Sequence, residues 1–193
     1  MTLEFNTRCF LRLAILTGMG ILVSIPAYHT WATRPSEYEV KAAYLFNFGR
    51  FVDWPPNVPS RQADDFAICV LGHDPFGRAL DTTISGQKIN DKPVVARRIS
   101  DVAEAATCRE LFISASENKQ LKEVFSNLGK LSVLTVSDIP DFMQQGGMVQ
   151  FVVADERVRF AINLAATQQA GLSLSSELLK VATEVRGTSR PGN

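Results

Sequence analysis

The segment Phe66–Leu71, with the sequence FAICVL, constrains the fold of this chain more than any other segment. It is apolar throughout, and Asp65 and Gly72 bound it on either side. A strand with one solvated face alternates apolar and polar residues, whereas a strand buried on both faces shows an unbroken apolar run. The segment therefore predicts a central strand of a parallel sheet.

The segments that follow alternate between strand and helix patterns. Strands are predicted at 94–99, 111–114 and 132–136. Helices are predicted directly after Asp74-Pro75, at 120–125 and around 174–181, and Asp74-Pro75 would cap the first of these helices. Residues 148–154 and 157–163 are predicted to form a β-hairpin, and because its turn lacks a glycine, a longer loop is the alternative to a tight turn. Together these elements predict an α/β fold, a three-layer sandwich with a largely parallel sheet, helices on both faces and a C-terminal antiparallel hairpin.

The first helix of this domain has a clear start and a clear end. Ser36 and Glu39 have the spacing of a capping box, and Pro55-Pro56 cannot continue a helix. The predicted core stripe consists of Val40, Tyr44, Phe48 and Phe51, with Leu45 and Val52 beside it. Phe46 lies off this stripe, so the helix is either buried on two sides or presents a face that docks a partner or a second copy.

The N-terminus has the pattern of a secretory signal. Arg8 and Arg12 precede an apolar run at 13–25, which is shorter than the roughly 20 residues that a membrane-spanning helix needs. We expect residues 1–32 to be a signal peptide cleaved after Ala32, with Ala27 as the second candidate and an uncleaved anchor as the alternative. Residues 33–193 would then form one periplasmic domain.

Removal of the signal would leave two cysteines, Cys69 and Cys108. An even number of cysteines in an oxidising compartment favours a disulfide bond, and a loop of about 40 residues makes such a bond worth roughly 4 kcal/mol in the chain-entropy model. Two buried thiols are the alternative.

The charge balance excludes several classes of partner. The chain has 20 basic and 20 acidic side chains, and without Arg8, Arg12 and Glu4 the numbers become 18 and 19. A domain with a net charge near zero has no electrostatic footprint for nucleic acid or for an anionic membrane surface.

No complete catalytic or metal-binding pattern is present. Gly72–Ala79 has the glycine spacing of a phosphate-binding loop, but Arg78 and Ala79 stand where Lys and Ser/Thr are required. His73 would be the only histidine left, and the chain has no Gly-x-Ser-x-Gly motif to supply a nucleophilic serine for it. We therefore interpret His73 as a turn residue. The ligand spacings of zinc or calcium sites are absent, and we expect no enzyme activity, no cofactor and no metal.

The candidate surface for a protein partner has an apolar and a polar part. Trp54, at the end of the first helix, and Phe46 are the candidate apolar anchors. Arg157, Arg159 and Asn163 lie on the strand face opposite Val158, Phe160 and Ile162, which we expect to face the core. A face that simply meets solvent is the alternative for the polar part.

Several segments together resemble the YfiR-like family of exported bacterial proteins. These are YEVKAAYLFNFGRFVDWP at 38–55, ICVLGHDPFG at 68–77, CRELFIS at 108–114, VLTVSD at 133–138, Gly146-Gly147, RVRFAIN at 157–163 and AGLSLSSELLK at 170–180. The resemblance implies an α/β sandwich without an established catalytic site, and Cys69 and Cys108 match the positions of a family disulfide. A second cysteine pair of the family's named repressor is missing here.

The resemblance also implies a function. The family's named member represses a diguanylate cyclase of the inner membrane by acting on its periplasmic part, and loss of this repression raises cyclic di-GMP and favours biofilm. We therefore expect a periplasmic regulator that contacts such a cyclase, with a homodimer as a further state. The alternative is a small-molecule carrier or an enzyme with a pocket at the strand ends near Gly72–Gly77 and Ser114.

We predict that the exported protein begins at Thr33. N-terminal sequencing of protein recovered from the periplasm checks this, because cleavage after Ala32 exposes that residue as the first. A membrane-bound product that begins at Met1 would contradict the cleaved signal, and a start at Tyr28 would identify Ala27 as the cleavage residue.

Overall fold

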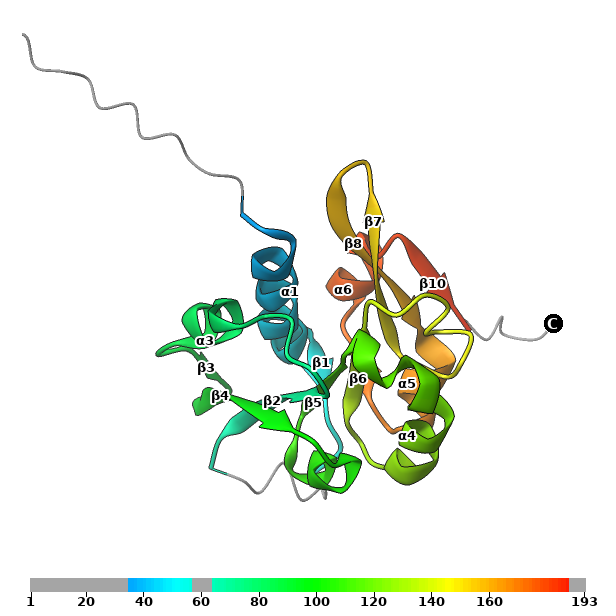
Figure 1. The fold of residues 1–193 in the computed structure, drawn as a ribbon, viewed down its shortest axis with the longest axis horizontal. Coiled ribbons are helices and arrows are strands. Elements are labelled where there is room, and N and C mark those ends of the chain that lie inside the picture. Colours follow the sequence, from blue (N-terminus) through cyan, green and yellow to red (C-terminus); the bar gives the residue numbers. More distant parts are fainter. Residues whose placement is uncertain (1–34, 57–63, 188–193) are drawn as a thin grey trace, which may run out of the picture. The chain divides into compact units, whose positions relative to one another are not determined.

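An eight-stranded sheet organises the part of the chain that the computed structural model describes, residues 35–56 and 64–187 (Figure 1). The strands are β2 (Phe66–Leu71), β3 (Lys88–Ile89), β4 (Lys92–Ile99), β5 (Glu110–Ile113), β6 (Leu134–Ser137), β7 (Val149–Ala154), β8 (Arg157–Asn163) and β10 (Glu184–Arg186). Their order across the sheet is β10-β8-β7-β6-β5-β2-β4-β3. Pairing is antiparallel between β3 and β4 and between β7 and β8, and parallel between the other neighbours. The predicted signal peptide and its cleavage site lie outside the described residues.

Helices and one short strand pair complete the domain. The helices are α1 (Glu37–Phe51), α3 (Arg78–Ile84), α4 (Leu121–Leu128), α5 (Leu164–Gln169) and α6 (Ser176–Val181), with the 3₁₀ segments η1 (Val102–Thr107) and η2 (Ala115–Gln120). Strand β1 (Val52–Asp53) continues directly from α1 and pairs antiparallel with β9 (Ser173–Leu174).

Strand β2 lies between β4 and β5, and all six of its residues are buried, which confirms the central strand predicted from FAICVL. Phe66, Ile68 and Val70 pack in one apolar cluster with α1, α3 and α6. The alternate residues Ala67, Cys69 and Leu71 pack in a second cluster with η1 and α4. The sheet thus has helices on both faces.

The fold is mixed α/β with a mostly parallel sheet and an antiparallel β7–β8 hairpin, as predicted in outline. The sequence analysis did not predict that the sheet curls into a half-barrel. Because of this curl, Val94 of β4 and Ile162 of β8, near opposite ends of the strand order, join the same cluster around Phe48 of α1. The inherent twist between neighbouring strands makes such curling favourable.

Helix α1 begins as predicted. The Ser36 side chain accepts a hydrogen bond from the Glu39 backbone, and the Glu39 carboxylate accepts one from the Ser36 backbone, which completes the capping box. Its buried face is shifted from the predicted stripe. Phe48 is buried as expected, but Lys41 and Ala42 are buried while Phe51 is 37% exposed.

The prediction that Asp74-Pro75 caps a helix is wrong. Helix α3 begins at Arg78, and its N-cap is Gly77, whose φ of 53° lies in the left-handed region that favours glycine. Asp74 instead accepts the backbone N–H of Phe76 at 2.8 Å and pairs with Arg98 at 2.9 Å. The residues before Gly77 therefore form a turn stabilised by a side chain.

The β7–β8 hairpin closes through a tight turn. Ala154 pairs with Arg157, so only Asp155 and Glu156 connect the strands. Both have positive φ, 50° and 57°, as a type I′ turn requires. The longer loop considered from the missing glycine is therefore not adopted.

The predicted disulfide is confirmed. Cys69 in β2 is bonded to Cys108, two residues before β5, with a Cα–Cα distance of 5.9 Å. Both cysteines are fully buried in the apolar cluster on the α4 side of the sheet. The bond thus links two neighbouring strands of the sheet.

Trp54 is a core residue, which contradicts the expectation of an exposed apolar anchor. Its side chain is 6% exposed and packs edge to face on Phe66, with ring centroids 5.4 Å apart. Its indole Nε1 donates to the backbone oxygen of Arg109 at 3.2 Å. The sequence shows where the helix ends, but it does not show that Trp54 packs on Phe66 of β2.

We predict that Trp54→Ala lowers the free energy of unfolding by about 3–5 kcal/mol, because it leaves a cavity in the core. Thermal and denaturant unfolding of the purified domain measure the loss. Val181→Ala is the control, since Val181 is 64% exposed and should change stability by no more than about 0.5 kcal/mol. Wild-type stability of Trp54→Ala would contradict the core role.

Candidate functional site

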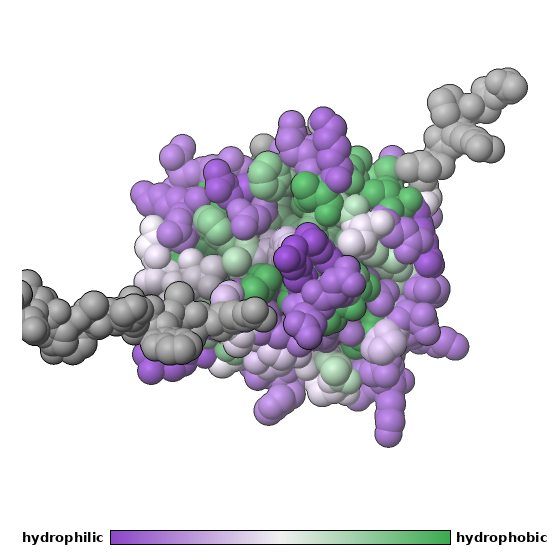
Figure 2. All heavy atoms as spheres, turned by 90° about the horizontal axis from the view of Figure 1, so that it is seen from above, coloured by the Kyte–Doolittle hydropathy of each residue, from purple (hydrophilic) through white to green (hydrophobic). Residues whose placement is uncertain are grey.

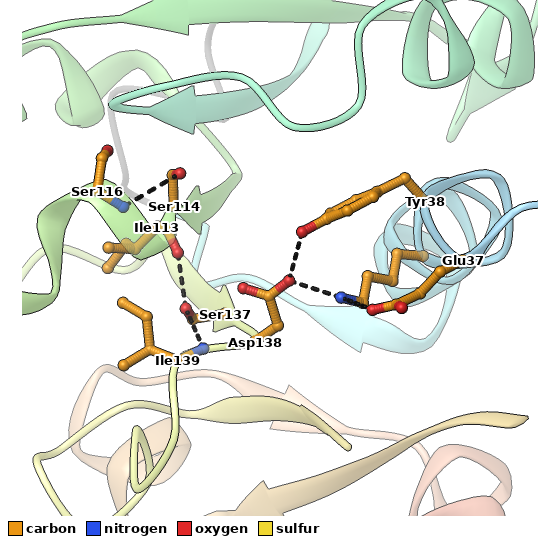
Figure 3. Close-up of polar contacts among 9 residues, drawn as sticks. Glu37, Tyr38, Ile113, Ser114, Ser116, Ser137, Asp138 and Ile139 are labelled. Atoms are coloured by element: carbon orange, nitrogen blue, oxygen red, sulfur yellow. Dashed lines mark hydrogen bonds and ion pairs between the residues drawn. The ribbon is translucent and has the colours of Figure 1, made fainter. Parts of the chain in front are cut away.

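The first turns of α1 meet the end of β6 at Tyr38, Lys41 and Asp138, which we call the α1–β6 clasp (Figure 3). Lys41 Nζ lies 2.6 Å from Asp138 Oδ2, and the Tyr38 hydroxyl donates to the same oxygen at 2.9 Å. Glu37 pairs with the Lys41 ammonium at 2.5 Å. The clasp thus joins two helix side chains to one carboxylate at the end of a strand.

Ser137 holds this strand end in place. Its hydroxyl donates to the backbone oxygen of Ile113 at 2.6 Å and accepts the backbone N–H of Ile139 at 3.0 Å. Because Ile113 is the last residue of β5, the hydroxyl links the ends of two neighbouring strands. Asp138 is therefore presented to α1 from a fixed backbone.

The clasp is buried and its groups are already paired. The Lys41 side chain is 2% exposed and the Asp138 side chain 16%. Burial, together with the hydrogen bond to Asp138, raises the pKa of Tyr38 well above its usual range, so the phenol stays a neutral donor at physiological pH. Removing one partner of a buried ion pair typically costs about 3–5 kcal/mol. The clasp therefore supplies no free base or nucleophile and acts as a structural joint.

The predicted strand-end crevice near Gly72 is occupied by side chains. A Cβ atom on Gly72 would collide with the side chains of Ser116 and Glu117. The Ser116 hydroxyl accepts the backbone N–H of His73 at 3.0 Å and donates to Glu117 at 2.8 Å. The Ser116 hydroxyl is therefore engaged by the backbone of His73 and by Glu117. Ser114, the other residue predicted at this crevice, is only 4% exposed.

The residues predicted for a partner surface have different environments. Arg157 and Arg159 are exposed on β8, opposite the buried Phe160, as the strand pattern predicted. Asn163 has a structural role, because its side chain caps α5 by accepting from Ala166 N–H at 3.2 Å and donates to Met143 O at 3.3 Å. Phe46 is half-buried against the core. Their contact with a partner stays a prediction.

Three large apolar residues are exposed among the described residues, Phe51, Val153 and Val181, and the sequence analysis singled out none of them as a surface residue. Phe51 and Val181 line a cavity of about 260 Å³ between α1, β8 and α6. Val153, 61% exposed, lines another of about 730 Å³ between the start of α1 and the hairpin. In Figure 2, hydrophilic residues cover the centre of the visible face and hydrophobic surface gathers toward its upper right. In the sequence, the apolar segment 151–154 directly before the charged turn Asp155-Glu156 was the signal that could have indicated an exposed Val153.

Glu110 in β5 is a buried carboxyl group that sequence reasoning missed. It is 0% exposed, and neither carboxylate oxygen has a hydrogen-bond partner among the described residues. Burial raises the pKa of Glu110 well above its usual range. Helix α1 crosses directly above it at Gly49, where an added Cβ would lie only 2.9 Å from Glu110 Oε1. The carboxyl group is thus enclosed between helix and sheet, where its neutral form is favoured.

The described residues contain neither a metal-binding cluster nor a membrane-spanning helix. Residues 35–56 and 64–187 contain no group of three or more His, Cys, Asp or Glu side chains placed to hold a metal ion. In the same part of the chain no helix has the length and apolar character needed to cross a membrane.

Comparisons with solved structures show the fold. A conserved domain protein from Vibrio cholerae O1 biovar El Tor superimposes with a TM-score of 0.54 at 10% identity, covering 80% of this chain and 62% of that one. The ABC domain from Streptococcus pneumonia in complex with L-Trp gives a TM-score of 0.53 at 11% identity, covering 75% and 60%. This chain thus spans about three fifths of each of these structures.

Sequence comparisons are more specific. The family model described as YfiR/HmsC-like matches residues 38–183. None of the curated proteins matches the chain.

We predict that Glu110 makes the fold less stable as pH rises. Below the unfolded-state pKa of about 4.3 the carboxyl is protonated in both states, so it imposes no ionisation cost. Above it the unfolded chain ionises while the folded one keeps its proton, and stability falls by about 1.4 kcal/mol per pH unit until the folded pKa is reached. Glu110→Gln should therefore stabilise the protein relative to wild type by an amount that grows as the pH rises above about 5.

Thermal unfolding of both proteins across this range measures the difference. The exposed Glu177→Gln is the matched control and should follow the wild-type pH dependence. Parallel pH curves for wild type and Glu110→Gln would contradict a neutral buried carboxyl.

Proposed function

Because the chain belongs to the YfiR/HmsC-like family, we propose that it is a periplasmic regulator that binds the periplasmic part of an inner-membrane diguanylate cyclase and lowers its activity. The family match over residues 38–183 is the observation that carries this proposal. It covers the fold from the first turn of α1 to the residue before β10. By its general description the family is regulatory and non-catalytic.

Features of the described residues support a role in binding. The ionisable groups of the α1–β6 clasp are paired with one another and hold α1 against the sheet. Exposed apolar side chains and the exposed Arg157 and Arg159 are instead available at the surface. A Cys69–Cys108 bond fits the oxidising periplasm.

The alternative of a ligand carrier with a pocket at the strand ends has less support. Ser116 and Glu117 fill the space beside Gly72, so a ligand there would have to displace them. The bound L-Trp belongs to a structure only 11% identical to this chain, and that likeness shows the fold alone.

We predict that deleting the gene for this chain raises cyclic di-GMP in its host and that the full chain restores the basal level. Direct binding implies that the purified, oxidised protein is retained by the purified periplasmic part of a host cyclase. Mass-spectrometric quantification of cyclic di-GMP and a pull-down measure the two effects. An inactive cyclase variant is the control, since it should still bind the chain while cyclic di-GMP no longer responds to it. Unchanged cyclic di-GMP together with no retention by any host cyclase would contradict the proposal.

A further inference from the structure

The β7–β8 hairpin extends beyond its neighbours in the sheet. The two strands stay paired up to Ala154 and Arg157. Strand β6, however, pairs with β7 only as far as Gln150, and β10 pairs with β8 only from Ala161. The remainder, residues 151–160, forms a two-stranded arm that rises past the other elements in Figure 1. Beyond Phe151 on β7 and before Ala161 on β8, the edges of this arm lack a neighbouring strand.

The hydrogen-bond register shows which backbone groups of the arm point outward. Asn163 N–H donates to Met148 O at 2.7 Å, so this pair occupies a hydrogen-bonded position of the hairpin ladder. Bonded and non-bonded pairs alternate along an antiparallel ladder. The pairs of Phe151 and Val153 are therefore non-bonded, and the backbone N–H and C=O groups of these two residues point away from β8.

The two edges of the arm differ in how these groups are satisfied. On the β8 edge, Phe160 O accepts bonds from the backbone N–H and the hydroxyl of Thr183, both at 2.9 Å. Val158 O accepts from the Tyr44 hydroxyl at 3.4 Å. On the β7 edge, the register with β6 directs Phe151 N–H to Ser137 O, whereas the outward N–H and C=O of Val153 lie beyond the last residue paired with β6. The β7 edge is thus the unpaired one.

We propose that the β7 edge, Phe151–Ala154, is the docking site through which this chain binds its cyclase, by accepting an extended segment of that partner as an added strand. This inference rests on the proposed function. An extended backbone is the complement of such an edge because it repeats donors and acceptors at the same spacing. The sequence FVVA favours strand pairing and lacks the proline or lysine with which proteins commonly block an exposed edge.

The hollow beside the edge suits the side chains of such a segment. Val153 and Val158 of the arm and Val40 and Tyr44 of α1 line it, together with the charged residues Glu37, Asp155, Glu156, Arg157 and Arg159, and its volume is about 730 Å³. Side chains alternate between the two faces of a strand, so every second residue of an added segment would enter this hollow. We therefore expect a partner segment whose alternate residues match this mixed apolar and charged lining.

A second copy of this chain fits the edge less well. Two β7 edges paired about a two-fold axis would join about four residues per copy, or about 13 Å of strand. Stable interfaces usually involve about 20–30 residues on each side. A partner segment can pair with the edge and also fill the hollow, and it therefore gains contacts that two identical edges do not.

Substitutions at Val153 test the edge without touching the hairpin ladder. Val153→Pro removes an N–H that points away from β8, a position where an edge strand tolerates proline. Val153→Lys keeps the N–H and places a charge at the edge, as natural blocked edges do. Val181→Lys is the matched control, since Val181 is also an exposed valine, 64% against 61%, but lies on α6 beside the other apolar cavity.

Binding is measured by calorimetry against the purified periplasmic parts of the host's membrane-bound diguanylate cyclases. We expect both Val153 variants to weaken binding by roughly tenfold or more and Val181→Lys to bind within about twofold of wild type. Thermal unfolding establishes that each variant is folded. If Val153→Pro does not fold, Val153→Lys decides the result alone.

Three results of the binding measurements overturn the inference. Wild-type affinity of the folded Val153 variants would remove the edge from the interface and leave the proposed function standing. Loss of binding in Val181→Lys alone would assign docking to the cavity between α1 and α6. If the wild type binds none of the cyclases, the proposed function falls and the docking site falls with it. As a second measurement, amide exchange at Val153 should slow in the complex, and unchanged exchange would contradict an added strand.

Discussion

The close approach of α1 to the sheet is the constraint on which the rest of the structure depends. At Gly49 the helix comes so near that an added Cβ would lie 2.7 Å from Ile89 Cδ1 and 2.8 Å from Phe66 Cζ. A glycine inside a helix costs about 1 kcal/mol relative to alanine, so its presence indicates a packing requirement. With the helix this close, strands from both halves of the curled sheet reach the same apolar cluster.

The two ends of α1 meet ionisable groups of the sheet in opposite ways. Near its start, Lys41 is buried but paired with Asp138, so both can remain charged. Near its end, Glu110 is buried without a hydrogen-bond partner among the described residues, so its neutral form is favoured. The start of α1 is therefore held by the ion pair between Lys41 and Asp138. The end of α1 is held by close contact of Gly49 with uncharged groups of the sheet.

The sequence predicted those features that depend on residues close together in the chain or on the regular repeat of apolar residues along one strand or helix. The unbroken run FAICVL predicted the central strand, Ser36 and Glu39 predicted the helix start, and the alternation around Phe160 predicted the buried face of β8. The α1–β6 clasp and the burial of Trp54 were not predicted. Asp138 lies 97 residues from Lys41, and Trp54 reaches the backbone of a residue 55 positions away, so no local pattern reports their burial. The start of α3 was missed because an Asp-Pro pair suits both a helix cap and the turn that Asp74 forms.

The pairing of β1 with β9 has a consequence for how the chain acquires its structure. It joins Val52 to Leu174, so the strand that follows the first helix finds its partner near the other end of the chain. A polypeptide that emerges with its N-terminus first cannot complete this contact until most of the domain has followed. Until then α1 lacks the α6 and β8 side chains that cover Phe48. Such dependence on distant contacts slows folding and lengthens the time for which apolar surface stays accessible to other chains.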